Sequence, residues 1–136
     1  MSDHYILIGQ TPVKCDLMTW ATWFETNDRR VAHTMVGPVE VSTVFLGLDH
    51  NFHSIITGSP GPPILFETMA FTGVAKPHEN CECFHCTHPR QALDLLERCA
   101  TWLEAEAQHA RIVAQFVAEH PQDPVVDLLA VDAGRA

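Results

Sequence analysis

The sequence has few basic residues, and this shortage bears directly on function. Its 136 residues include eight lysines and arginines against 17 aspartates and glutamates, for a formal net charge of −9. Only two of the basic residues are lysines, Lys14 and Lys76. Binding to a nucleic-acid backbone depends on cationic side chains. We therefore expect no binding to duplex nucleic acid, unless the acidity itself imitates DNA toward a basic partner.

Long apolar runs and known catalytic strings are also lacking. No window approaches the roughly 18 apolar residues that a helix needs to span a bilayer. The segment MSDHYILIGQTPVK lacks the charged region and the apolar stretch of a signal peptide. We therefore expect no membrane partner and a cytosolic protein. Phosphate-binding glycine loops, nucleophile elbows, and HExxH or GxGxxG strings are absent, so the evidence for an enzyme is thin.

What is present predicts an α+β fold. Apolar residues make up 46% of the chain, which is typical of a folded globular protein. Segments with an apolar period of 3.6 residues predict helices at about 17–27 and 102–119. The stretches YILIG, TPVKC, RVAHTMV, VEVSTVFLGL and ILFETMAF predict strands. We expect an antiparallel sheet of about four or five strands packed by the two helices.

Three further expectations concern the arrangement of the chain. VEVSTVFLGL becomes apolar on both faces toward its end, which predicts a central strand covered on both sides. Residues 90–99 fit a helix or a short strand equally well. Residues 1–120 are predicted to form one domain. The irregular tail at 121–136 carries several apolar residues, and we expect it to be docked.

A loop at residues 78–88, HENCECFHCTH, concentrates cysteine and histidine. Thiolate and imidazole are the usual ligands of tetrahedral Zn²⁺, and Cys83 and Cys86 have the CxxC spacing. We predict a structural zinc ion held by Cys81, Cys83, Cys86 and His88, with His78 or His85 as alternates. The usual signature has two ligand pairs a dozen or more residues apart. A remote fourth ligand is therefore also considered: Cys15, Cys99 or His109. The alternatives are an exposed loop with incidental thiols and a reversible redox pair. An iron–sulfur cluster is disfavoured, because it needs four thiolates and only three are local.

Three residues are weak candidates for acid–base chemistry. Asp49 and His50 lie at a predicted strand end, where functional groups often occur. His53 follows them, but a turn cap with solvated histidines is the simpler interpretation. Glu67 lies on an apolar strand face, where a carboxylate more often pairs with a cation, here Arg29 or Arg30. His109 is expected to pack by its ring edge at the border of the core.

Several strings together resemble a known family. They are FETNDRRVAHTMVGPVEVSTVFLGLDHNF, GPPILFETMAF and ATWLEAEAQHARIV. In this order they are similar to a family of small uncharacterised proteins encoded by phages and prophages, over roughly residues 12–72 and 97–115. The resemblance implies a phage setting and no particular reaction. The insert HSIITGSP and the cysteine-rich segment depart from the family pattern, so a metal there would belong to this chain's own elaboration.

These observations favour a small acidic accessory protein that acts by binding, in the cytoplasm of a bacterial host. The expected partner is a host protein or a small signal molecule, engaged through the loops at 51–63 and 73–90. One alternative is a small hydrolase-type enzyme that uses Asp49, His50 and Glu67. Another is a virion or assembly component, for which homo-oligomerisation is expected.

Overall fold

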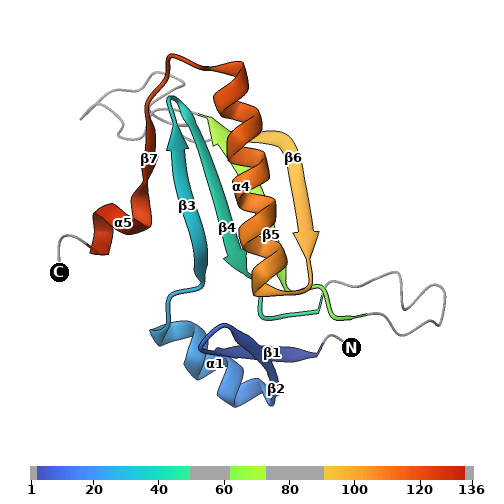
Figure 1. Cartoon of the computed structure of the whole chain (residues 1–136). Helices are drawn as coiled ribbons and strands as arrows, with labels where there is room; N and C mark the ends of the chain where they lie inside the picture. Colours follow the sequence, from blue (N-terminus) through green and yellow to red (C-terminus); the bar gives the residue numbers. More distant parts are fainter. Residues whose placement is uncertain (1–2, 50–61, 73–90, 134–136) are drawn as a thin grey trace.

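The computed structural model describes residues 3–49, 62–72 and 91–133, and Figure 1 labels the elements within them. In chain order the elements are β1 (His4–Ile8), β2 (Thr11–Cys15), α1 (Leu17–Thr26), β3 (Arg30–Val36), β4 (Val39–Phe45), β5 (Phe66–Thr72), β6 (Gln91–Cys99), α4 (Trp102–Glu119), β7 (Val125–Asp127) and α5 (Leu128–Ala133). The predicted α+β class is confirmed: one antiparallel sheet has the order β6-β5-β4-β3-β7, and β1 pairs with β2 in a separate hairpin.

Strand β4 lies at the centre of the five-stranded sheet, as the sequence predicted. Its residues Val39, Val41, Thr43 and Phe45 are buried on one face. The alternate residues, such as Val44, are only partly buried. The second face of the strand is therefore less covered than its apolar sequence led us to expect.

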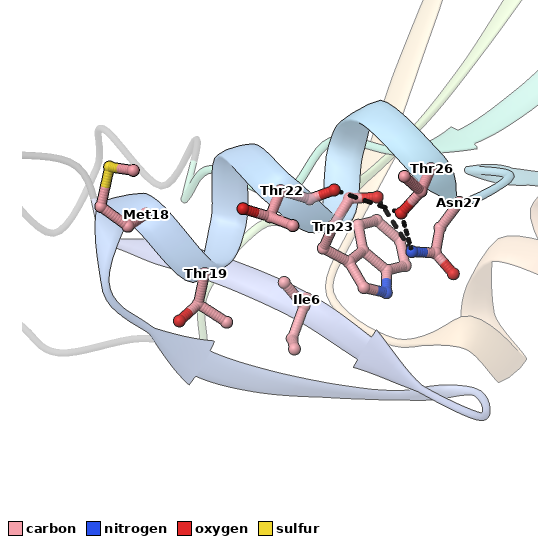
Figure 2. A pocket seen from close by; sticks show the side chains of 7 residues that line it. All are labelled: Ile6, Met18, Thr19, Thr22, Trp23, Thr26 and Asn27. Carbon is pink, nitrogen blue, oxygen red and sulfur yellow. Dashed lines mark hydrogen bonds between the residues drawn. The ribbon is translucent and has the colours of Figure 1, made fainter.

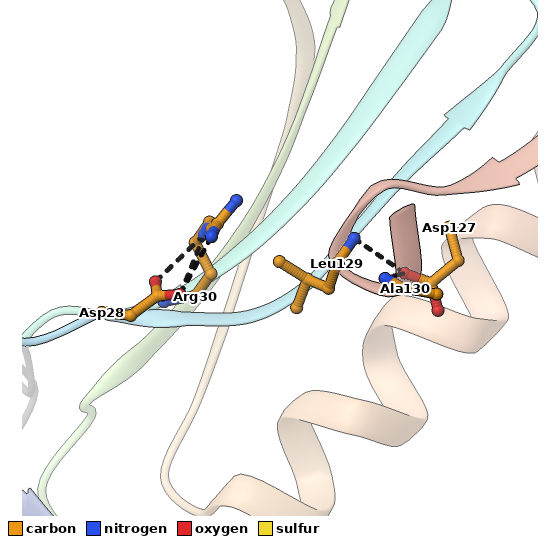
Figure 3. A network of polar contacts seen from close by, with 5 residues as sticks. All are labelled: Asp28, Arg30, Asp127, Leu129 and Ala130. Carbon is orange, nitrogen blue, oxygen red and sulfur yellow. Dashed lines mark hydrogen bonds and ion pairs between the residues drawn. The ribbon is translucent and has the colours of Figure 1, made fainter. Parts of the chain in front are cut away.

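The two segments that periodicity left irregular or undecided both contribute strands. Residues 91–99 form the edge strand β6, which pairs with β5 through a register shift between Met69 and Phe71. In the tail, Val125 lies opposite Val36 and Asp127 opposite Thr34, which places β7 on the far edge of the sheet. Oδ1 of Asp127 then accepts hydrogen bonds from the first turn of α5 (Figure 3). A three-residue strand is too short to reveal itself by alternation.

Helix α4 covers one face of the sheet (Figure 1). Its buried residues are Ala105, His109 and Ile112, which recur at helical spacing on one stripe. Ala105 belongs to an apolar cluster with Phe45, and Ile112 belongs to a second cluster with Ala70. His109 therefore lies between two apolar clusters, in the middle of the interface between helix and sheet.

Both ring nitrogens of His109 are hydrogen-bonded to threonines of the sheet. Nε2 lies 2.8 Å from the hydroxyl of Thr34, and Nδ1 lies 2.8 Å from the hydroxyl of Thr43. Thr43 also contacts the hydroxyl of Thr68 at 2.6 Å, and the Gln108 amide donates to Thr68 at 2.8 Å. The expectation of a border histidine packed by its ring edge is wrong, because strands distant in sequence supply polar partners for the ring.

Helix α1 and the β1–β2 hairpin lie together at one end of the sheet (Figure 1). Trp23 and Phe24 of α1 contact Phe45 of β4, with ring centroids 5.7 and 6.4 Å apart. Gly47 follows β4 with a φ of +76°, and a Cβ there would lie 2.2 Å from a carbon of the Phe24 ring. Only glycine combines that backbone conformation with so close an approach of the helix.

We predict that Thr43→Val lowers the free energy of unfolding by about 1–3 kcal/mol, the usual cost of a buried group left without its partner. Valine conserves the shape of threonine and removes the hydroxyl that bonds to His109 and Thr68. Urea unfolding followed by tryptophan fluorescence measures the change. Thr11→Val is the matched control, because Thr11 is exposed on β2 and is expected to change stability by less than about 0.5 kcal/mol. Equal effects of the two substitutions would contradict the role of the buried bonds.

The same histidine makes stability depend on pH. Burial lowers the pKa of His109 below its ordinary value of 6.5, the carboxylate of Asp127 opposes this shift and His33 adds to it. As the pH falls, the unfolded chain therefore binds this proton before the folded one, and the stability present above 6.5 is progressively lost. His109→Gln removes this titration, so its stability is expected to fall less than that of the natural chain between about pH 7.5 and 5.5.

Candidate functional site

Asp49, a weak candidate for catalysis, forms hydrogen bonds to the backbone of two other segments in the structure. Its Oδ1 accepts a hydrogen bond of 2.9 Å from the backbone N–H of Ile64, and its own backbone N–H donates to the carbonyl of Asp3. The first bond joins the described residues on the two sides of 50–61, and the second joins Asp49 to the residue before β1. His50 and His53 lie outside the described residues, so the expected pairing of Asp49 with His50 stays a prediction.

Glu67 joins two neighbouring strands. One of its carboxylate oxygens accepts from Nε of Arg98 on β6 at 2.9 Å, and the Glu67 side chain is 13% exposed. The expectation that it is paired is confirmed, but the expected partners Arg29 and Arg30 are wrong. Arg30 forms an ion pair with Asp28 at 3.0 Å (Figure 3), and Arg29 lies over an aromatic ring of α1. Asp49 and Glu67 thus serve separate contacts, one in a loop and one across the sheet.

The predicted zinc ligands at 78–88 all lie outside the described residues. Within residues 3–49, 62–72 and 91–133, no group of three or more His, Cys, Asp or Glu side chains suits a metal ion.

The structure describes the surroundings of the three remote ligands that the sequence suggested. Burial, and then the carboxylate of Glu104, raises the pKa of the Cys99 thiol to about 11. Burial also raises the pKa of Cys15. A bound metal ion itself deprotonates a coordinating thiol, so Cys15 and Cys99 stay predictions as remote ligands. Both nitrogens of His109 already contact threonines, so its ring has no nitrogen left for an ion.

A groove between α1 and the hairpin is a candidate site that no motif in the sequence predicted. Its volume is about 530 Å³. Figure 2 shows its lining: Ile6, Met18, Thr19, Thr22, Trp23, Thr26 and Asn27. None of these side chains is charged, although the whole chain carries a net charge of −9. The walls combine apolar surface with hydroxyl and amide groups, the usual composition of a binding site.

Helix α1 is capped at both ends, and the threonines that line the groove lie on one side of it. Oδ1 of Asp16 accepts from the backbone N–H of Thr19 at 2.7 Å and caps the first turn. At the other end, the backbone N–H of Asn27 donates to the carbonyl of Trp23. Thr19, Thr22 and Thr26 recur at intervals of three and four residues, so their side chains share one stripe.

The hairpin extends the groove with apolar surface. Ile6 lies opposite Val13 in the β1–β2 register, and Ile8 is two residues beyond Ile6, so all three side chains lie on one face. Ile8 is 63% exposed and Val13 38% exposed. On the helix, Met18 is 73% exposed. Four apolar side chains, Ile6, Ile8, Val13 and Met18, therefore form a surface continuous with the groove, which we call the α1–hairpin surface.

A signal of this surface was present in the sequence of α1. Helices on a protein surface usually carry charges on the face away from the core, yet Leu17–Thr26 contains a single charged residue, Glu25. Trp20 and Trp23 both have the helical spacing that is typical of core residues. In the structure Trp23 also lines the groove, and no α1 side chain is fully buried.

Comparison with known proteins returns no match: no family model fits the chain, and no curated protein or solved structure is similar to it. The resemblance to small phage proteins therefore stays a prediction. None of the helices within the described residues is long and apolar enough to cross a membrane.

Proposed function

We propose that this protein is a non-enzymatic accessory protein that acts by binding another protein, and that the α1–hairpin surface and its groove form the contact. The observation that carries the proposal is an uncharged, largely apolar groove on a strongly acidic chain. Exposed apolar patches on a small protein commonly mark interaction sites. The phage setting implied by the sequence strings makes a protein of the bacterial host the expected partner.

The shape of the surface favours a protein partner over a small signal molecule. The apolar side chains of Ile8, Val13 and Met18 extend the groove on both of its walls. A small molecule seated among the lining residues would leave Ile8 and Val13, which lie outside that lining, in water. A segment of a partner protein covers both the groove and its surroundings, as in other helix- and strand-lined recognition grooves.

The free energy gained by burying the exposed apolar side chains limits the affinity of this contact. Full burial of a large apolar side chain is worth roughly 1.5–3 kcal/mol, and Ile8, Val13 and Met18 are 63, 38 and 73% exposed. Burying them yields a few kcal/mol, which is comparable to the lower range of about 4–15 kcal/mol that association costs. The α1–hairpin surface therefore anchors the partner, and contacts elsewhere add to its affinity. The loops at 51–63 and 73–90 are the proposed source of these contacts.

A structural zinc ion belongs to the same proposal. Cys81, Cys83, Cys86 and His88 supply four ligands within one short segment, and a loop with so few apolar residues gains order most directly from a metal. A zinc-ordered loop offers a partner a fixed surface.

The groove is tested by Met18→Glu with Leu103→Glu as its matched control. Met18 and Leu103 are the second residues of α1 and α4, and they are 73% and 78% exposed. Glutamate is equally suited to the first turn of either helix, so the two variants differ in the surface that they charge. In affinity capture from a bacterial lysate, we expect Met18→Glu to lose the partners of the natural protein by about tenfold or more and Leu103→Glu to retain them. Identical captured proteins for both variants would remove the groove from the account.

The zinc ion is tested by elemental analysis of protein purified without an affinity tag. We expect about one equivalent of zinc per chain, and a loss of it in a Cys83→Ser, Cys86→Ser variant, because a structural site needs all four ligands. Ser54→Ala, in the other inserted loop, is the control and is expected to retain the metal. Less than about a tenth of an equivalent in the natural protein would end this part of the proposal.

A further inference from the structure

Strand β6 is a long edge of the five-stranded sheet. It spans nine residues, it pairs with β5 on one side, and no strand within the described residues pairs with its other side (Figure 1). The opposite edge is different, because β7 has only three residues. A long strand with an unpaired side presents backbone donors and acceptors to a further strand. The edge at β6 is therefore where this sheet can be extended.

The register of the sheet shows which residues of β6 point their backbone groups outward. The backbone N–H of Phe45 donates to the carbonyl of Arg29, so the backbone groups of Phe45 point toward β3. Phe66 lies opposite Phe45 and therefore directs its own groups the other way, toward Cys99 of β6. The direction alternates from one residue to the next along a strand. The groups of Cys99 thus point inward, and those of Leu96, three residues before it, point outward.

The side chains at this edge follow the same alternation. Leu93 and Leu95 pack against an apolar cluster beneath α4. Asp94, Leu96 and Arg98 therefore lie on the face of the sheet away from α4. All three are exposed, and the exposed fraction of Leu96 is 48%. The edge thus carries an exposed leucine, with an aspartate two residues before it and an arginine two residues after it.

This order of side chains is complementary to itself in an antiparallel pairing. If two copies of β6 lie antiparallel with Leu96 opposite its own copy, Asp94 of each chain lies opposite Arg98 of the other. Opposite charges directly across from each other stabilise paired strands, and like charges destabilise them. Registers centred on Asp94 or on Arg98 set like charges opposite each other. Registers centred one residue away from Leu96 set a charge opposite the leucine side chain.

We propose that β6 pairs with β6 of a second copy of this chain, antiparallel and centred on Leu96. The two sheets join into one continuous sheet, and the contact is the same patch on both chains, as in other symmetric dimers. Arg98 bonds to Asp94 of the second copy while its Nε keeps the bond to Glu67, because a guanidinium group has five donors. The inference goes beyond the proposed function, since no residue of the α1–hairpin surface belongs to β6.

Charge selects a second copy as the occupant of this edge. Backbone hydrogen bonds are the same for any added strand, so they do not distinguish one partner from another. The ion pairs do distinguish partners. Within the part of the chain that the structure describes, Asp94 has no cationic partner, and a second copy places Arg98 opposite it. Two chains of net charge −9 repel each other at long range, so their contact depends on such a local match of opposite charges.

Sedimentation of the full-length protein between about 1 µM and 1 mM tests the dimer. We expect the natural chain to dimerise as its concentration rises. Asp94→Arg sets two arginines opposite each other at both ends of the contact and is expected to weaken the dimer by about tenfold or more. Glu119→Arg is the matched control, because it makes the same change in net charge at an exposed position of α4. It is expected to dimerise like the natural chain.

Two further experiments test the register. Leu96→Lys sets two lysines opposite each other at the centre of the contact, and we expect it to weaken the dimer by about tenfold or more. Leu103→Lys is its control, because Leu103 is a 78% exposed leucine of α4. Asp94→Arg mixed with Arg98→Asp again sets opposite charges across the contact. We expect this mixture to form a heterodimer at concentrations where each variant alone is monomeric.

Three outcomes overturn the inference. The first is a natural chain that stays monomeric up to about 1 mM. The second is a dimer that both Asp94→Arg and Leu96→Lys leave unchanged, since its contact then lies elsewhere. The third is equal weakening of the dimer by the two control variants, which indicates a general effect of charge. The proposed function is tested separately by the capture experiment with Met18→Glu, because Met18 lies on α1 and not on β6.

Discussion

Hydrogen bonds from one buried histidine fix helix α4 on the sheet. The apolar contacts of Ala105 and Ile112 are not directional, and on their own they tolerate some sliding and rotation of the helix. The hydrogen bonds from His109 to Thr34 and Thr43 do not tolerate such movement of the helix, because each depends on distance and angle. They join the helix to two adjacent strands at one point. A fully paired polar group in a core specifies a single arrangement at little net gain in stability.

Helix α4 is connected to the α1–hairpin surface by a series of aromatic contacts. Trp102 opens α4 and contacts Phe66, which contacts Phe45 on the central strand. Phe45 in turn supports Trp23 and Phe24 of α1. A continuous series of aromatic contacts thus connects the start of α4 to the helix that lines the groove. With its core side held in this way, α1 presents its threonines and Met18 to solvent on a rigid base.

Local patterns in the sequence predicted the parts of the fold that depend on local physics. Asp16 and Thr101 cap the two main helices, and both helices begin at the predicted residues. Alternating apolar residues predicted strand β4, and the apolar residues on both of its faces predicted its central place in the sheet. Residues 91–99 were undecided because Leu93, Leu95 and Leu96 satisfy both periods, and the register shift against β5 disturbs alternation. The partner of Glu67 was missed for the same reason, since Arg98 becomes its neighbour only when 91–99 is a strand.

The candidate site depends on tertiary contacts that no local pattern encodes. The threonines that bind His109 lie 75 and 66 residues away from it in the chain. The groove forms only where the hairpin meets α1, and the sequence showed it only as a helix poor in charge. The zinc ligands were predicted from spacing alone, and because 78–88 lies outside the described residues they stay a prediction.

Hydrogen–deuterium exchange of the protein, alone and bound to its captured partner, tests the claim that the α1–hairpin surface is where this protein binds. Backbone amides that are covered by a partner, or held more firmly by it, exchange more slowly. The account predicts slower exchange in residues 4–27, which comprise the hairpin and α1, with α4 unchanged. Protection confined to strands β3 to β6, with none in 4–27, would contradict it.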